Sequence, residues 1–200
     1  MEKEFYFDVD GVILDFEGAF VDFIRDTYRP ELPQDFRLKY WELSKEFPDI
    51  DMGEGWEKFV GSERFTKLSL LVSKNTFNKL TNGYPTYLVT NIPQDLIAKR
   101  KQNLSRHLLN YSELYCAGHW DFGIKEYPSK SGIINQLHEK GKHIIFLDDH
   151  PTNCKEVAAN VPGAHVFLMT RLHNQDEADD PCWTRVSGWD ELIVCVDEII

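Results

Sequence analysis

Two pairs of acidic residues stand where hydrophobic segments end, and they are the side chains best suited to chemistry. Asp8 and Asp10 close a short aromatic-rich segment, whereas Asp148 and Asp149 follow the apolar run HIIFL at 143–147. Because parallel strands bind ligands beyond their carboxyl ends, both pairs would converge on one crevice. Carboxylates held that close raise each other's pKa unless a cation lies between them, and hard oxygen ligands suit Mg²⁺. The pattern therefore predicts a magnesium site.

Groups that could hold a phosphate lie at two further positions. Thr90 and Asn91 end another apolar segment, and a hydroxyl with the backbone amides after it can bind phosphate oxygens. Pro93 would begin the next helix, whose positive N-terminus would face the same site. Lys130 begins a later helix, where a positive charge opposes the helix dipole, so we expect it to have an anionic partner elsewhere. Lys125 is the alternative phosphate-binding lysine.

Alternating strands and helices must position these residues. Strands are predicted over 4–9, 84–90, 113–117, 143–147 and 164–169. Helices are predicted over 94–109, 129–140, 152–160 and 189–200, the first of them with a solvated basic stripe made of Lys99, Arg100, Lys101 and Arg106. This alternation predicts an α/β fold with a mostly parallel sheet covered on both faces.

The stretch 16–80 interrupts the alternation and is rich in aromatic residues. An amphipathic helix is predicted over 16–28, with shorter helices around 38–46, 55–61 and 69–80. We therefore expect a small helical cap over 16–80, inserted after the first strand, and an α/β core formed by 1–15 and 81–200. Most of the cap's aromatic side chains would form its own core, and the rest would line a pocket.

The composition excludes several classes of protein. With 33 acidic and 22 basic residues the formal net charge is −11, which argues against binding to nucleic-acid polymers or anionic membranes. The four cysteines show no paired spacing, and the isolated C-x-x-H of Cys116 and His119 does not suffice for zinc, so we expect reduced thiols. No signal peptide or membrane-spanning run is visible, and a cytoplasmic location is expected.

The order of the motifs is informative in itself. Asp-x-Asp, then Thr, then Lys, then Asp-Asp, each at a strand end or a helix start, resembles the haloacid dehalogenase-like (HAD) phosphohydrolase superfamily over nearly the whole chain. The resemblance implies a doubly wound, Rossmann-like core with the small cap after its first strand. It also implies phosphoryl transfer through an aspartyl-phosphate.

The resemblance assigns roles to five positions. Asp8 matches the nucleophile, and Asp10 matches the general acid and base that protonates the leaving oxygen and then activates water. Thr90, together with the amide of Asn91, matches the phosphate-holding position. Lys130 matches the lysine that neutralises the nucleophile and the transferring phosphoryl group.

The same resemblance implies the metal ligands. Mg²⁺ would be held by Asp8, by the backbone carbonyl of Asp10 and by Asp149. Asp148 would support this shell, and Asn153 lies where a supporting polar residue is usual.

A narrower resemblance concerns the two ends of the chain. The strings DVDGVILDFEGAF and HVFLMTRLHNQ, the latter followed by W-x-R-V-x-x-W-D-E-L, are similar to the 5′(3′)-deoxyribonucleotidase branch and its bacterial relatives. In that branch Phe16 matches an aromatic residue that packs on the substrate base. Nucleoside monophosphates and other small phosphate esters, sugar phosphates included, both stay open as substrates.

The expected function is a Mg²⁺-dependent phosphomonoesterase acting on a small phosphorylated metabolite, as a monomer or homodimer. Asp10 favours a phosphatase over a dehalogenase, because a halide leaves without a proton. A phosphomutase and a non-catalytic protein that binds a phosphoryl ligand are the alternatives. A signalling receiver domain is disfavoured, because its acidic pair follows the first strand and its motif order ends in lysine.

Overall fold

Six parallel strands form the single sheet of the computed structural model, which describes residues 2–118 and 127–199. Their order is β3-β2-β1-β4-β5-β6, and every neighbouring pair is parallel. The strands are β1 (Lys3–Phe7), β2 (Thr86–Thr90), β3 (Glu113–Cys116), β4 (His143–Asp148), β5 (His165–Met169) and β6 (Thr184–Val186). The α/β prediction is confirmed. The sixth strand was not predicted, because three residues are too few to show a periodic pattern.

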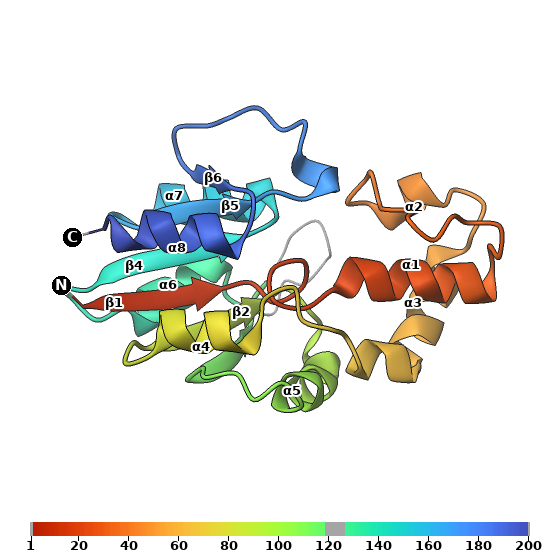
Figure 1. The fold of residues 1–200 in the computed structure, drawn as a ribbon, viewed down its shortest axis with the longest axis horizontal. Helices are drawn as coiled ribbons and strands as arrows, with labels where there is room; N and C mark the ends of the chain where they lie inside the picture. Colours follow the sequence, from red (N-terminus) through yellow and green to blue (C-terminus); the bar gives the residue numbers. More distant parts are fainter. Residues whose placement is uncertain (1, 119–126, 200) are drawn as a thin grey trace.

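Helices cover both faces of the sheet (Figure 1). On one face, α6 (Lys130–Leu137) and α7 (Pro151–Asn160) bury side chains such as Ile134 and Val157 against Phe146. On the other face lie α4 (Lys74–Thr81), α5 (Ile97–Ser105, after the 3₁₀ turn Gln94–Leu96) and α8 (Trp189–Asp197). The sheet is doubly wound, as its continuous apolar strands require.

Besides the last helix, which was expected over 189–200 and ends at Asp197, two predicted helices end earlier than expected. The helix expected over 94–109 stops at Ser105, and Leu108 adopts the left-handed conformation with φ 54°. The helix expected over 129–140 stops at Leu137, because His138 turns away and its Nδ1 lies 2.9 Å from Oε2 of the buried Glu4. Both ends depend on contacts with distant parts of the chain, which periodicity does not record.

Residues 16–68 form a helical segment that leaves and rejoins the rest of the chain at neighbouring points, and we refer to this segment as the cap. The chain leaves the core at Asp15 and returns at Ser69, whose carbonyl accepts the Asp15 amide at 2.9 Å. Between them lie α1 (Phe16–Thr27), α2 (Leu43–Glu46), α3 (Met52–Gly61) and the 3₁₀ turn η1 (Glu63–Thr66), which occupy the right side of Figure 1. The side chain of Asp15 caps α1 by accepting the Gly18 amide at 2.9 Å.

Helix α4 falls inside the range 16–80 expected for the cap, yet it packs on the sheet. Its Phe77 ring lies 5.8 Å from the rings of both Phe7 and Trp189. The division into a cap of 16–80 and a core of 1–15 and 81–200 stays a prediction. Over the described residues, no helix combines the length and the apolar character needed to cross a membrane.

Candidate active site

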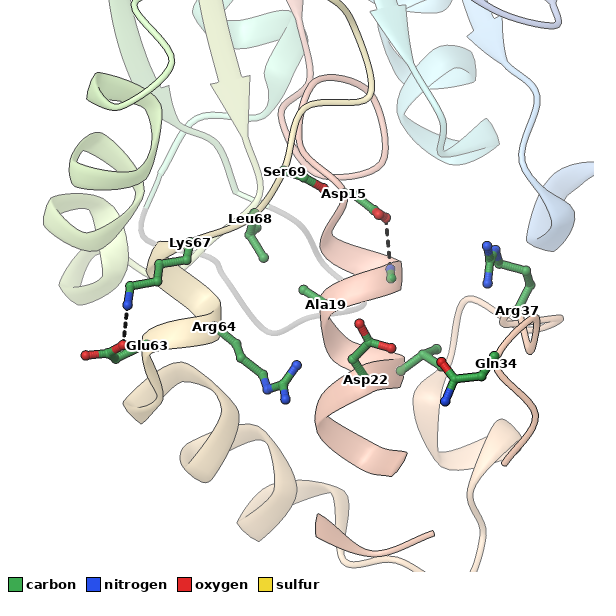
Figure 2. Close-up of a pocket in the computed structure, with 12 residues that line it drawn as sticks. Asp15, Ala19, Asp22, Gln34, Arg37, Glu63, Arg64, Lys67, Leu68 and Ser69 are labelled. Carbon is green, nitrogen blue, oxygen red and sulfur yellow. Dashed lines mark hydrogen bonds and ion pairs between the residues drawn. The ribbon is translucent and has the colours of Figure 1, made fainter. Parts of the chain in front are cut away.

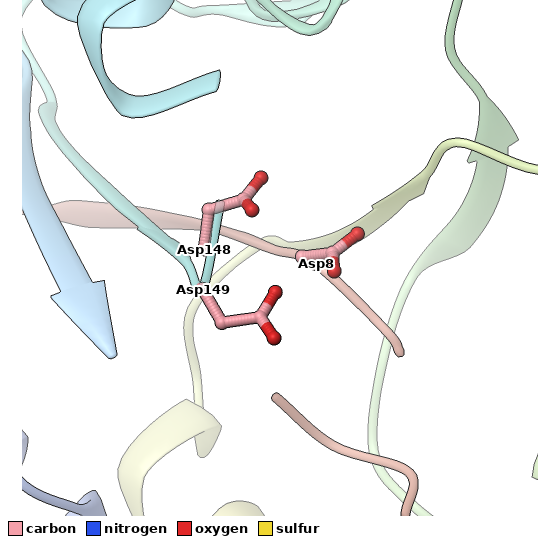
Figure 3. Close-up of side chains that lie close together, drawn as sticks. All are labelled: Asp8, Asp148 and Asp149. Carbon is pink, nitrogen blue, oxygen red and sulfur yellow. The ribbon is translucent and has the colours of Figure 1, made fainter. Parts of the chain in front are cut away.

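Three buried carboxylates gather at the carboxyl ends of the central strands. Asp8 follows β1, Asp148 ends β4 and Asp149 follows it, and one oxygen from each lies within 4.8 Å of the others. Figure 3 shows the three side chains lying close together, with their carboxylates directed toward the same side of the view. All three are buried, and the convergence expected of both acidic pairs is found for these three residues, whereas Asp10 is not in the group.

Lys130 supplies the positive charge in this cluster. Its Nζ lies 2.6 Å from Oδ1 of Asp8 and 2.7 Å from Oδ2 of Asp148. Burial lowers the pKa of Lys130, but the attraction of Asp148 and Asp8 outweighs it, so its pKa is raised and the ammonium stays charged. The lysine at a helix N-terminus thus has the anionic partners that its position led us to expect. Lys125 lies outside the described residues.

One ammonium does not balance three carboxylates. Burial, opposed by Lys130 and reinforced by Asp148, raises the pKa of Asp8 to about 7. Burial and the charges of Asp8 and Asp148 raise the pKa of Asp149 well above its usual range. The cluster therefore has a surplus of negative charge that a bound cation would relieve.

The two neighbouring carboxylates of β4 differ in their hydrogen bonds. Asp148 accepts from Lys130, from Asn153 Nδ2 at 3.0 Å and from the His150 amide at 2.8 Å. Both oxygens of Asp149 are buried without a hydrogen-bond partner in the described part of the chain. His173 Nε2 lies 3.5 Å from Asp149 Oδ2, too far for a hydrogen bond. Carboxylate oxygens without a hydrogen bond beside Asp8 fit a hard divalent cation such as Mg²⁺. The geometry thus suits Asp149 as a ligand and Asp148 as its support.

Gly11 closes the loop after β1 against Asp149. Its φ is 78°, in the left-handed region that favours glycine. A Cβ on Gly11 would lie 2.0 Å from Asp149 Oδ2, so no larger residue fits without moving that carboxylate. The Gly11 carbonyl accepts a hydrogen bond from Arg171 Nε at 2.6 Å.

Asp10 forms an ion pair with Arg100, which the sequence pattern predicted to be exposed to solvent. Nη2 of Arg100 lies 2.9 Å from Asp10 Oδ2, and the arginine is 0% exposed. The predicted solvated stripe on this helix is wrong for Arg100, although Lys101 is exposed as expected. Burial raises the pKa of Asp10, and the charge of Arg100 opposes that shift. The other oxygen, Asp10 Oδ1, is buried with no hydrogen-bond partner among the described residues.

Asn91, just after β2, connects the end of this strand to the segment after β3 and to α7. Thr90 is buried at the last position of β2. The side chain of Asn91 donates to the carbonyls of Ala117 and Gly118 at 3.2 and 3.1 Å, and its Oδ1 accepts from Asn153 at 3.1 Å. Because the Asn91 amide group is used in this way, its predicted role in phosphate binding rests on its backbone N–H.

Phe16 lies at the start of α1, within the aromatic cluster of the cap. Its ring is nearly parallel to that of Phe20, with centroids 5.9 Å apart and planes at 8°. The Phe59 ring is nearly perpendicular to it, with centroids 5.5 Å apart, and the Trp56 ring is tilted by 42°, with centroids 6.0 Å apart. The half-buried ring thus contributes to cap packing, and its predicted contact with a substrate base stays a prediction.

Several residues around Asp149 were not found from the sequence. Asn174 Nδ2 donates to the Asp149 carbonyl at 2.7 Å, and burial lowers the pKa of the neighbouring His173 to about 4. From the cap, the Trp41 ring meets the rings of His150 and His173 edge-on, at 4.6 and 4.9 Å. The position of His173 and Asn174 after the end of β5 is a signal that could have identified them, but no local pattern identifies Trp41.

A groove of about 590 Å³ lies in the cap along one side of α1 (Figure 2). Its lining is largely charged and includes Asp15, Asp22, Arg37, Arg64 and Lys67. Asp8 and Asp149 are not among the lining residues, so the groove is separate from the carboxylate cluster.

Comparisons with known proteins find similarity in structure alone. No protein-family model matches the chain, and no curated protein matches it in sequence. Among solved structures, L-2-haloacid dehalogenase from Xanthobacter autotrophicus superposes with a TM-score of 0.63 at 12% identity, covering 100% of both chains. A HAD-superfamily hydrolase of subfamily IA from Geobacter sulfurreducens gives 0.57 at 17% identity, covering 98% of this chain and 96% of its own.

The HAD-hydrolase YfnB from Bacillus subtilis, solved with bound magnesium, gives a TM-score of 0.63 at 16% identity, covering 98% of this chain and 99% of its own. Identities this low show the fold and not the activity. The 5′(3′)-deoxyribonucleotidase branch is not shown by these structures. The chain has the fold of the HAD-superfamily hydrolases.

Proposed function

We propose that the chain is a Mg²⁺-dependent phosphomonoesterase that acts through an aspartyl-phosphate on Asp8. The observation that carries the proposal is Asp10, a carboxyl group two residues after Asp8 whose side chain is 18% exposed and whose Oδ1 has no hydrogen-bond partner among the described residues. A leaving alkoxide needs a proton, and a leaving halide does not. Asp10 therefore supports phosphate-ester chemistry over the dehalogenation named for some structural neighbours.

The proposed reaction has two steps. A carboxylate oxygen of Asp8 attacks phosphorus, the bond to the ester oxygen breaks, and Asp10 donates its proton to that oxygen. Water then attacks the aspartyl-phosphate, Asp10 takes a proton from the water, and the bond between Asp8 and phosphorus breaks. Lys130, in contact with Asp8, neutralises charge in both steps.

Mg²⁺ would be held by Asp8, Asp149 and the backbone carbonyl of Asp10, with Asp148 in support. When bound, the ion supplies positive charge against the phosphate oxygens and against the repulsion between the carboxylates. The unpartnered oxygens of Asp149 support this assignment. Thr90 and the amide of Asn91 are proposed to bind phosphate oxygens.

The proposed substrates are small phosphorylated metabolites, with nucleoside monophosphates and sugar phosphates as the two classes to compare. The half-buried ring of Phe16 supports the first class, since a base can stack on an aromatic face.

The experiment is a substrate panel with purified protein. Phosphate release is measured from p-nitrophenyl phosphate, nucleoside monophosphates and sugar phosphates, and chloride release from 2-chloropropionate, with Mg²⁺ or with EDTA. We expect phosphate release that requires Mg²⁺ and is lost in Asp8→Asn. Chloride release without phosphate release would overturn the proposal, as would phosphate release that persists in Asp8→Asn or in EDTA.

A further inference from the structure

Arg100 carries a full charge inside the protein with little to compensate for it. The side chain is 0% exposed, and its one hydrogen bond to a described residue is to Asp10. Nε and Nη1 have no hydrogen-bond partner among the described residues. The guanidinium lies over the ring of Phe65, 4.6 Å from its centroid. Because a buried ion pair often adds little net stability, stability alone does not account for this arginine.

We propose that Arg100 is a positioning residue that fixes the carboxyl group of Asp10 for proton transfer. The inference rests on the proposed phosphatase activity and adds a residue to it. Arg100 engages Oδ2 of Asp10 and leaves Oδ1 without a partner in the described part of the chain. Oδ1 is thus the oxygen that would face the leaving group.

The two buried cations of the site hold different carboxylates. Lys130 contacts Asp8 and Asp148 at 2.6 and 2.7 Å, and its hydrogen bonds do not include Asp10. Arg100 contacts Asp10, and its guanidinium carbon lies over the ring of Phe65. A planar group held on one face by a ring fixes direction better than an ammonium does. Asp10 is thereby oriented independently of the nucleophile.

Arg100 packs on Phe65 of the cap, but its polar contact is to Asp10, whereas two neighbouring side chains make polar contacts with the cap alone. Lys99 Nζ donates to the Val60 carbonyl at 2.6 Å, and Arg106 Nη1 donates to the Thr66 carbonyl at 3.2 Å. These side chains contact cap backbone, whereas Arg100 contacts a side chain of the proposed catalytic pair. Arg106 is therefore a matched control.

Arg100 takes no part in the proton transfers of the proposed reaction. Asp10 gives a proton to the ester oxygen as that oxygen leaves phosphorus, and regains one from water as the aspartyl-phosphate is cleaved. Loss of Arg100 should therefore slow the first step in proportion to how much the leaving group needs a proton. An alkyl phosphate needs one, and p-nitrophenyl phosphate, which releases a stable anion, does not.

The test uses the full chain with Mg²⁺ and compares kcat/KM for p-nitrophenyl phosphate and for an alkyl phosphate that the wild type cleaves. For Arg100→Met, we expect kcat/KM to fall about 100-fold on the alkyl phosphate and less than about tenfold on p-nitrophenyl phosphate. For Arg106→Met, we expect the same factor on both esters. In a protein that already carries Asp10→Asn, adding Arg100→Met should lower kcat/KM on the alkyl phosphate little further.

Equal losses on both esters in Arg100→Met would overturn the inference, as would a loss in the Asp10→Asn background equal to that in wild type. If Arg100→Met does not fold, Arg100→Lys decides: a loss larger on the alkyl phosphate supports the inference, and equal losses overturn it. Wild-type protein that cleaves neither ester, or Asp8→Asn that keeps activity, contradicts the proposed function instead. If activity depends on Asp8 but Arg100→Met leaves the ratio of kcat/KM for the two esters unchanged, the role of Arg100 is contradicted and the proposed function is not.

Discussion

Among the single residues of the site, Asp148 and Asp149 are chemically identical neighbours with different surroundings. Asp148 is surrounded by donors from Lys130, Asn153 and the His150 amide. Asp149 has two buried oxygens without a hydrogen-bond partner in the described chain. The hydrogen bonds of Asp148 thus suit it to a structural role, and their absence at Asp149 suits that carboxylate to metal binding.

Two matched substitutions test this difference. We expect Asp149→Asn to weaken Mg²⁺ binding by at least tenfold without lowering metal-free stability, because it removes a charge that Asp8 repels. Asp148→Asn should lower the free energy of unfolding by about 3 kcal/mol, because Lys130 loses half of its compensation. Titration calorimetry with Mg²⁺ and urea unfolding without metal measure the two effects. The reverse pattern would contradict the assignment of ligand and support.

Among the elements of the fold, the loop after β1 and the helices α5 and α6 bring the carboxylates and cations of the site together. The loop after β1 passes so close to Asp149 that Gly11 has no room for a side chain. Helix α6 begins at Lys130 and α5 places Arg100 beside Asp10, so each cation enters the site from a helix that packs on the sheet.

Gly11→Ala tests the contact between this loop and Asp149. The added Cβ must displace the carboxylate, so we expect at least a tenfold loss of Mg²⁺ affinity as well as destabilisation. Gly83→Ala is the matched control, since Gly83 has φ 81° and open space around its Cβ position. It should show only the backbone strain, about 1 kcal/mol, with Mg²⁺ affinity unchanged. Equal Mg²⁺ affinities in the two variants would refute the close contact.

Sequence patterns predicted the parts of the site that follow strands and missed the parts that depend on how elements pack. The positions of Asp8 and Asp149 follow from apolar runs ending in acids, a local signal. Arg100 belongs to a helix that is basic on the surface, and only the position of the cap shows that this one arginine is buried. Trp41 is beyond prediction for the same reason, since its contacts lie more than a hundred residues away.

For the whole molecule, the net charge of −11 is compatible with a phosphate ligand. Four of the acidic residues, Asp8, Asp10, Asp148 and Asp149, lie in the site, where two buried cations accompany them. A divalent cation would cancel much of the remaining charge. Folding and metal binding should therefore be coupled.

Thermal unfolding measures this coupling. A cation that binds only the folded state at 100 times its Kd adds about 2.7 kcal/mol. For a chain of this size that corresponds to a rise in Tm of roughly 5–10 °C. We expect this rise with Mg²⁺ in the wild type and its loss in Asp149→Asn. A Tm that does not respond to Mg²⁺, or a rise that persists in Asp149→Asn, would show that the cluster is not the metal site.

The central claim is that Asp8 accepts the phosphoryl group, and chemical trapping tests it most directly. The protein is mixed with Mg²⁺ and a substrate that it cleaves, quenched in acid and reduced with borohydride, which converts an aspartyl-phosphate to homoserine. Mass spectrometry of the peptide around Asp8 should show homoserine at that position, and an Asp8→Asn control should show none. Phosphate release with the trapped residue elsewhere, or with no trapped residue and full activity in Asp8→Asn, would contradict the account.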